Sequence, residues 1–138
     1  MSWFNCKVSF DKPMPIGNGV KIQKVSESYL VEADDFTEVE AIVAKELMNC
    51  GGYIVDHIRK VRLCDVFLER NADRFYNCKV AFIKLDVKGV ERRKREQFVV
   101  QAGGFEEAVK AFAHNLDTML VEYEIVSVQE TDYVGLIR

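Results

Sequence analysis

The octapeptide WFNCKVSF at residues 3–10 returns almost unchanged as FYNCKVAF at residues 75–82, with five of eight positions identical. Two more segments recur in the same order: YLVEADDFTE at 29–38 resembles FVVQAGGFEE at 98–107, and YIVDHI at 53–58 resembles YEIVSV at 123–128. The offset drifts only between 69 and 72 residues, and the drift falls between segments, where loops tolerate insertions. Three matches in register indicate a tandem duplication.

Each half begins with the same predicted pair of strands. The octapeptide alternates with the period of two that marks a half-buried strand. One side carries Phe4, Cys6, Val8 and Phe10, and the other carries Trp3, Asn5, Lys7 and Ser9. A connection rich in Gly and Pro follows at residues 11–19, and its shorter counterpart is DVKG at 86–89. Both connections predict a hairpin that leads into a second strand.

A helix and a third strand are predicted next. Asp35 followed by Glu38 forms the pattern of a capping box, and apolar residues then recur at helical spacing. Gly104 takes the cap position in the second half, and Cys50-Gly51-Gly52 is expected to end the first helix. The later strands are expected at 53–61 and 123–131, with short fourth strands at 65–69 and 132–137.

The repeated unit is therefore strand–strand–helix–strand, with a fourth short strand. One helix cannot cover both faces of its sheet, which gives a physical reason for pairing two units. We expect an α+β fold with pseudo-twofold symmetry, mainly antiparallel sheet and two helices. Residues 1–70 form repeat 1 and residues 71–138 form repeat 2 of a single compact domain, and the repeats are expected to share one core or to continue one sheet.

Composition excludes several classes of protein. The 138 residues carry a net charge of −3 that is spread evenly between the halves, so no global basic field attracts nucleic acid. No apolar run approaches the roughly 20 residues that span a membrane, and the N-terminus lacks the layout of a signal peptide. We expect a cytoplasmic protein that makes no membrane contact.

Four segments together resemble a family of small uncharacterised proteins, a domain of unknown function. The matching patterns are W-F-x-C-K-V at 3–8, Y-L-V-x-A-x-x-F-T-E-x-E at 29–40, Y-x-x-K-V-A-F-I at 76–83 and Y-E-I-V-S-V-x-E-T at 123–131. The resemblance implies an origin in Bacteroides-type bacteria, their mobile elements or their phages, where that family occurs. The resemblance covers nearly the whole chain and implies a small cytosolic accessory protein, but it brings no catalytic motif.

Catalytic and metal-binding patterns are poor. None of the four cysteines stands at C-x-x-C spacing, and His57 and His114 are not at a ligand spacing, so we expect free thiols, no metal and no cofactor. Cys6 and Cys78 fall on the apolar side of their strands and are interpreted as small buried hydrophobic residues. No nucleotide-binding or hydrolase motif occurs, and we therefore favour a protein that is not an enzyme.

The opposite side of the repeated strand carries an aromatic, an amide and a cation in both copies. The pairs are Trp3 with Phe75, Asn5 with Asn77, and Lys7 with Lys79. An aromatic can stack on a base, an Asn can read a base edge and a Lys can meet a phosphate. Packing between the units and a surface for self-association or another partner are the alternatives.

The strongest local charge feature lies at the second hairpin. Its basic residues are Lys88, Arg92, Arg93, Lys94 and Arg95, with Glu91 and Glu96 beside them. A protruding basic hairpin can contact phosphates or enter a groove. The alternative is a solvated edge strand whose charges prevent unwanted pairing.

Three functions stay open at this point. The first is a non-enzymatic binding module for DNA or RNA in a phage or mobile-element setting, with the repeated aromatic, Asn and Lys face and the basic hairpin as its site. The second is an oligomeric accessory factor, for example one that blocks a host protein. The third is a small-ligand or nucleotide binder with its site between the repeats.

Overall fold

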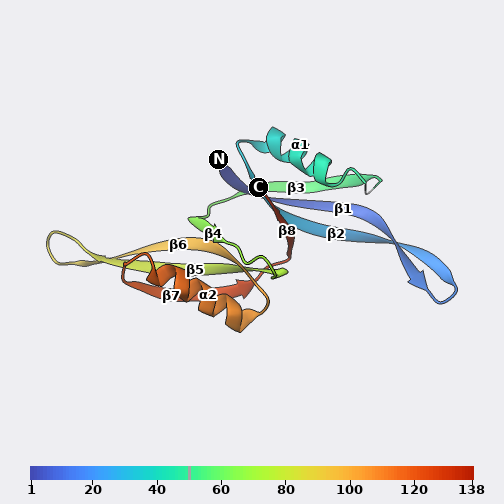
Figure 1. Ribbon diagram of the computed structural model, residues 1–138. Helices are drawn as coiled ribbons and strands as arrows, with labels where there is room; N and C mark the ends of the chain where they lie inside the picture. Colours follow the sequence, from blue (N-terminus) through green and yellow to red (C-terminus); the bar gives the residue numbers. More distant parts are fainter. Residues whose placement is uncertain (50) are drawn as a thin grey trace. The chain divides into compact units, whose positions relative to one another are not determined.

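The computed structural model describes residues 1–49 and 51–138 and confirms the α+β class (Figure 1). Repeat 1 provides β1 (Ser2–Ile16), β2 (Gly19–Ala33), α1 (Phe36–Glu46), β3 (Tyr53–Val61) and β4 (Asp65–Phe67). Repeat 2 provides β5 (Arg74–Leu85), β6 (Glu91–Ala102), α2 (Phe105–Asp117), β7 (Tyr123–Glu130) and β8 (Tyr133–Ile137). The expected order of elements is therefore present in both halves. Cys50, which was expected to help end α1, lies outside the described residues.

The strands form two four-stranded sheets, ordered β3-β1-β2-β8 and β4-β6-β5-β7. In each sheet the hairpin occupies the centre and the third strand pairs antiparallel with its first strand. The fourth strands are exchanged: β4 pairs parallel with β6 of the second repeat, and β8 pairs parallel with β2 of the first. The two compact units are consequently residues 1–61 with 133–138, and residues 62–132.

Each sheet has its own hydrophobic cluster beneath its own helix. In the first unit β1 and β2 pack against α1 through Phe4, Cys6, Val8, Val31, Ala33, Val39, Val43 and Leu47. In the second unit β5 and β6 pack against α2 through Tyr76, Cys78, Val80, Phe98, Val100, Ala102, Ala108, Phe112 and Leu116. The two lists occupy matching positions, as duplication requires. The interpretation of Cys6 and Cys78 as buried hydrophobic residues is confirmed.

The expectation of one continuous sheet is wrong, because the strands form two separate sheets. Some buried residues belong to neither helix-covered cluster, namely Trp3, Leu30, Val66, Phe75, Ala81 and Val99. A core shared by the repeats stays a prediction, and each unit completes its sheet with a strand from the other repeat. That residues 1–138 behave as a single domain stays a prediction.

Both helices begin after the cap residues that the sequence predicts, Asp35 and Gly104. The side chain of Asp35 accepts a 2.8 Å hydrogen bond from the backbone N–H of Glu38, which is the predicted N-cap contact. The Glu38 carboxylate accepts from the N–H of Asp34 at 3.4 Å, one residue before the position that a standard capping box uses. Gly104 caps α2 without a side-chain bond.

The first hairpin differs from its prediction. Residues 11–19 were expected to form a connection, but β1 continues to Ile16 and only Gly17 and Asn18 form the turn. Gly17 has a positive φ of 55°, and among the described non-glycine residues only Leu120 shares that sign, so the turn has the geometry of type II′. The prolines at 13 and 15 are tolerated because strand pairing in this hairpin leaves their nitrogens at the outer edge.

Candidate nucleic-acid interface

Residues 83–95, the end of the β5–β6 hairpin, extend beyond the part of β5 that pairs with β7 and are called the basic arm here. Asp86 organises its turn. One carboxylate oxygen accepts hydrogen bonds from the N–H groups of Lys88 and Val90, both at 2.9 Å, and the other lies 3.3 Å from Nε of Arg92. Gly89 supplies the positive φ of 77° that the turn needs.

The cations of the basic arm lie on both faces of the ribbon. Register places Lys84 beside Arg92 on the face shared with Phe82 and Lys94, whereas Arg93 and Arg95 occupy the other face. Three of these cations contact a carboxylate: Arg92 with Asp86, Arg93 with Glu124 at 2.6 Å, and Lys94 with Glu96 at 3.2 Å. Within residues 1–49 and 51–138, Lys84, Lys88 and Arg95 form no ion pair.

A hollow of about 350 Å³ lies at the base of the basic arm. Its lining residues are Arg62, Lys79, Lys94, Arg95, Glu96 and Gln97. Lys79 of the repeated octapeptide and Arg95 of the basic run, which sequence reasoning assigned to two separate features, therefore meet at one site. Arg62 was missed because it precedes β4, and only the pairing of β4 with β6 brings it to this sheet.

The aromatic rings of the repeated face are buried, as the packing alternative predicts. Trp3 is 8% exposed and Phe75 is 4% exposed, so neither ring is open for a base to stack on. The guanidinium of Arg138 lies 5.5 Å from the centre of the Trp3 ring. The side-chain oxygens of Asn5 and Asn77 are both buried without a hydrogen-bond partner among the described residues.

That burial favours the packing alternative for the face as a whole. Lys79 is its most accessible member and lines the basic hollow, whereas Lys7 is half-buried in the other unit. A role of Trp3, Asn5, Lys7, Phe75 and Asn77 in binding stays a prediction.

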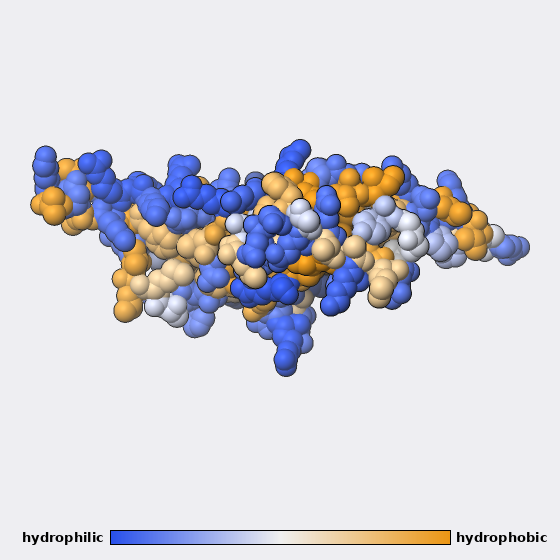
Figure 2. All heavy atoms as spheres, turned by 90° about the horizontal axis from the view of Figure 1, so that it is seen from above, coloured by the Kyte–Doolittle hydropathy of each residue, from blue (hydrophilic) through white to orange (hydrophobic). Residues whose placement is uncertain are grey.

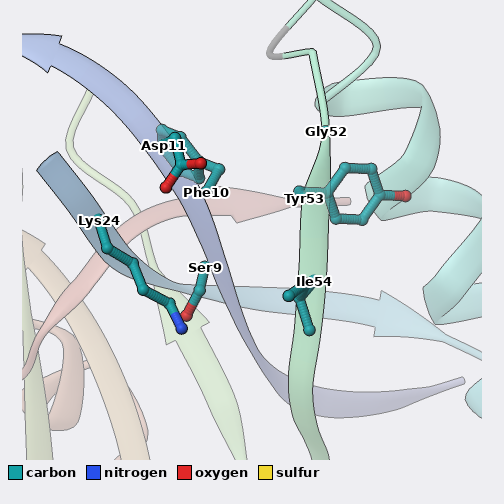
Figure 3. Close-up of a pocket in the computed structure, with 7 residues that line it drawn as sticks. All are labelled: Ser9, Phe10, Asp11, Lys24, Gly52, Tyr53 and Ile54. Carbon is teal, nitrogen blue, oxygen red and sulfur yellow. The ribbon is translucent and has the colours of Figure 1, made fainter. Parts of the chain in front are cut away.

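A second hollow, of about 330 Å³, lies on the first unit (Figure 3). It contains Ser9, Phe10, Asp11 and Lys24 of the β1–β2 hairpin together with Gly52, Tyr53 and Ile54. The Ser9 hydroxyl donates to the Asp56 carboxylate and contacts the Ser26 hydroxyl at 3.1 Å. Ser9 is buried, and among residues 1–49 and 51–138 its hydroxyl bonds to Asp56 and Ser26 rather than to a histidine or an amine, so the geometry does not support a nucleophilic serine.

A third hollow, of about 490 Å³, combines an apolar wall with cations. Phe82, Met119 and Val121 provide the wall, and Lys84, Arg92 and Lys94 of the basic arm stand at its rim together with Glu96 and Cys64. Burial, Glu96 and Asp65 raise the pKa of the Cys64 thiol, so this exposed cysteine is not an activated nucleophile.

The described residues contain no cluster that could hold a metal ion and no helix that could cross a membrane. Nowhere in residues 1–49 and 51–138 do three His, Cys, Asp or Glu side chains cluster in a way that could hold a metal ion. Neither α1 nor α2, the helices in this part of the chain, is long and apolar enough to cross a membrane.

The chain was compared with protein-family models, with curated proteins and with solved structures. A search of curated proteins and a search of solved structures each found no match. One family model, described as a domain of unknown function (DUF4494), matches residues 2–138 and therefore covers both repeats and the exchanged strands. The chain belongs to the DUF4494 family.

Proposed function

We propose that this protein is a non-enzymatic module that binds nucleic acid through its basic arm, as a cytoplasmic accessory protein of a phage or mobile element. The observation that carries the proposal is the arm itself: six cations on a two-stranded ribbon, on both faces, with only Asp86 and Glu91 as acids within it. A two-stranded ribbon is narrow enough to enter a nucleic-acid groove.

The distribution of charge supports this assignment. The basic arm has a net charge of +4, and residues 11–24 of the first hairpin have +2. Together they contain nine of the 19 basic and three of the 22 acidic residues, which leaves ten basic and nineteen acidic residues elsewhere. The remainder of the chain thus has a net charge of −9 and repels phosphates, so contact is directed to the hairpins.

The ion pairs of the basic arm do not prevent phosphate binding. The Arg93–Glu124 pair is exposed on both sides, and exposed ion pairs contribute only about 0–1 kcal/mol. A phosphate can therefore replace Glu124 as the partner of Arg93 at little cost. The side chains of Arg92 and Lys94 are also largely exposed, whereas their partners Asp86 and Glu96 are mostly buried. The basic hollow adds Arg62 and Lys79 at the base of the same ribbon.

A matched pair of triple variants tests the proposal. Arg92→Ala, Arg93→Ala and Arg95→Ala together remove three charges from the basic arm, whereas Lys45→Ala, Lys60→Ala and Arg70→Ala remove three exposed charges elsewhere. Fluorescence anisotropy with duplex DNA, single-stranded DNA and RNA at several salt concentrations gives the affinity. We expect the arm variant to bind at least tenfold more weakly, with a log–log salt slope lower by about 0.9 per lost contact.

The control variant should bind within about twofold of the parent, because nonspecific attraction depends on net charge far less than on local contacts. Equal losses in both variants would contradict a site on the arm. Absence of binding by the parent protein to every nucleic acid at low salt would end the proposal.

A second function has one observation in its favour. Both hairpins expose aliphatic side chains near their turns, as an oligomeric or partner-binding factor would. Sedimentation at increasing protein concentration tests self-association, and a strictly monomeric protein would contradict it. A ligand site between the repeats stays a prediction.

A further inference from the structure

The ends of both hairpins are apolar although their flanks are cationic. Residues 11–24, called the proline arm here, expose Met14, Ile16, Val20 and Ile22, and the basic arm exposes Leu85, Val87 and Val90. Val87 is 104% exposed and Val20 is 72% exposed, so neither contributes to a core. Figure 2 shows such apolar atoms, in orange, at the surface beside hydrophilic ones in blue. Exposing these apolar side chains to water costs free energy, so their burial against a partner is favoured.

The proline arm is a two-stranded ribbon with no neighbouring strand. β3 pairs with β1 only as far as Phe10, and β8 pairs with β2 only over Ser28–Val31, so residues 11–24 pair only with each other (Figure 1). A two-stranded hairpin alone is marginally stable in water. The fold therefore retains an extended ribbon that gains little from its own unit, which indicates that the ribbon is stabilised when it is bound.

The prolines close one edge of the proline arm, the outer edge of β1, to a partner that adds a strand. Pro13 lies opposite Ile22 and Pro15 opposite Val20, two alternate positions whose nitrogens face the same edge of the ribbon. Neither nitrogen can donate to a further strand, so this edge of the arm is closed to edge-to-edge pairing with a second copy or another protein.

The cations of both arms suit a groove better than a flat surface. On the proline arm, Lys12 and Lys21 lie on one face and Lys24 on the other, and the basic arm likewise places cations on both faces. A groove presents phosphates along both of its walls, whereas an anionic membrane presents them on one side only. Positive flanks and aliphatic ends together match proteins that enter the minor groove and wedge apolar side chains between base steps.

We propose that each arm enters a groove of duplex DNA and that its aliphatic end inserts between base pairs, so that the protein bends the duplex. This inference rests on the proposed function and specifies its substrate as double-stranded B-form DNA. Cations along the ribbon hold the two phosphate backbones, and the ends, with Val87 on one arm and Val20 on the other, displace stacking contacts. The bend exposes more of the groove to each ribbon and offsets the cost of unstacking.

Energy transfer between dyes at the two ends of a short duplex measures the bend, and anisotropy on the same duplex measures affinity. The variant Val20→Ser, Ile22→Ser, Leu85→Ser, Val87→Ser removes the aliphatic ends, and Met48→Ser removes an exposed apolar side chain outside the arms. We expect the parent and Met48→Ser to shorten the dye separation equally. The arm variant should leave the duplex straight and bind it about tenfold more weakly, with an unchanged salt slope.

The outcomes separate this inference from the function on which it rests. If binding depends on salt but the duplex stays straight, the aliphatic side chains do not insert between base pairs. The basic arm would then be a surface that binds phosphates only. Tighter binding to duplex RNA or to anionic phosphatidylserine vesicles than to duplex DNA would overturn the choice of substrate. No binding at all would overturn both. Unfolding curves for each variant test whether a lost bend results from a lost fold. We expect unchanged stability, because all substituted side chains are exposed.

Discussion

The hydroxyl of Ser9 donates a hydrogen bond of 2.5 Å to the carboxylate of Asp56, and the equivalent positions in the second repeat are Ala81 and Val126. Both Asp56 and Val126 lie at a β-bulge: Lys7 pairs with His57 and Val8 with Val55, just as Lys79 pairs with Ser127 and Val80 with Ile125. The bulge gives residues 56 and 126 no partner in the ladder. One bulge geometry thus accommodates a polar pair in one repeat and an apolar pair in the other.

A double-mutant cycle tests this relationship. Ser9→Ala and Asp56→Val each break the bond and should each lower the free energy of unfolding by about 1 kcal/mol, because one partner is left without the other. The double variant copies the second repeat and should recover at least half of the summed loss. Urea unfolding measures all four proteins, and strictly additive losses would mean that the contact contributes nothing.

The buried thiols predict a loss of stability at alkaline pH. Burial, with a smaller contribution from Glu40, raises the pKa of Cys6 to about 11, and burial raises that of Cys78 to about 12. The unfolded thiols ionise near pH 9, so the stabilisation is complete below pH 9 and is lost as pH rises toward 11 or 12. Each thiol should lower the unfolding free energy at about pH 10.5 by roughly 2 kcal/mol relative to neutral pH.

A Cys6→Ala, Cys78→Ala variant provides the control for the alkaline effect. It should lose less stability than the parent between neutral pH and about pH 10.5, whatever its stability at neutral pH. Denaturant curves at both pH values give the comparison. The same drop in both proteins would assign the effect to other groups.

Asp86 should oppose DNA binding through its charge and support it through its hydrogen bonds. Asp86→Asn keeps a side-chain oxygen for the N–H groups of Lys88 and Val90 but loses the ion pair with Arg92. We expect Asp86→Asn to bind about twofold to fivefold more tightly at low salt, with a salt slope steeper by about one. Asp86→Ala loses the ion pair and also the hydrogen bonds to Lys88 and Val90, so its affinity should rise less than that of Asp86→Asn. Equal affinities of the two variants would mean that the hydrogen bonds of the turn do not support DNA binding.

The single tryptophan reports on the repeated face. Because Trp3 is buried, its emission should be blue-shifted and only weakly quenched by iodide, and saturating DNA should leave the emission unchanged. Strong quenching by DNA would instead show that the ring stacks on bases and would restore the repeated aromatic face as a binding site.

Because the fourth strands are exchanged, a substitution in one repeat should destabilise a strand of the other repeat. Leu136→Pro interrupts β8 opposite Leu30, and Val66→Pro interrupts β4 opposite Val99. Each variant should lose about 2 kcal/mol or more, and hydrogen exchange should show which strand is released. Leu136→Pro should deprotect the amides of Ser28–Val31, and Val66→Pro those of Phe98–Val100. Loss confined to the repeat that carries the substitution would contradict the exchange.

Local patterns predicted the elements because local forces make them. The alternation in the octapeptide, the Asp35 cap and the recurring apolar residues of α2 each determine structure within a few residues, and all three are present. The partner of β4 or β8 could not be predicted, because parallel pairing over a long separation leaves no trace in a short apolar segment. The extent of β1 was missed because pairing with β2 overrides the tendency of two prolines to end a strand.

Part of the candidate site could also be predicted from local sequence patterns. A run of Arg and Lys on a hairpin is visible in the sequence, and its exposure follows from its charge. The burial of Trp3 and Phe75 was only one of several alternatives, because a period of two shows only that a strand has two different sides. It does not show whether the second side is also covered.

The exchanged strand β8 also affects the order in which the chain can fold as it is synthesised. Proteins made of consecutive domains usually complete the N-terminal one first. Here the sheet of the first repeat lacks its outer strand β8 until residues 133–137 have left the ribosome. The outer strand β4 of the second sheet is synthesised before the strands of the second repeat. The repeat that is translated first is therefore the one that is completed last, and its strand β2 remains an open edge throughout elongation.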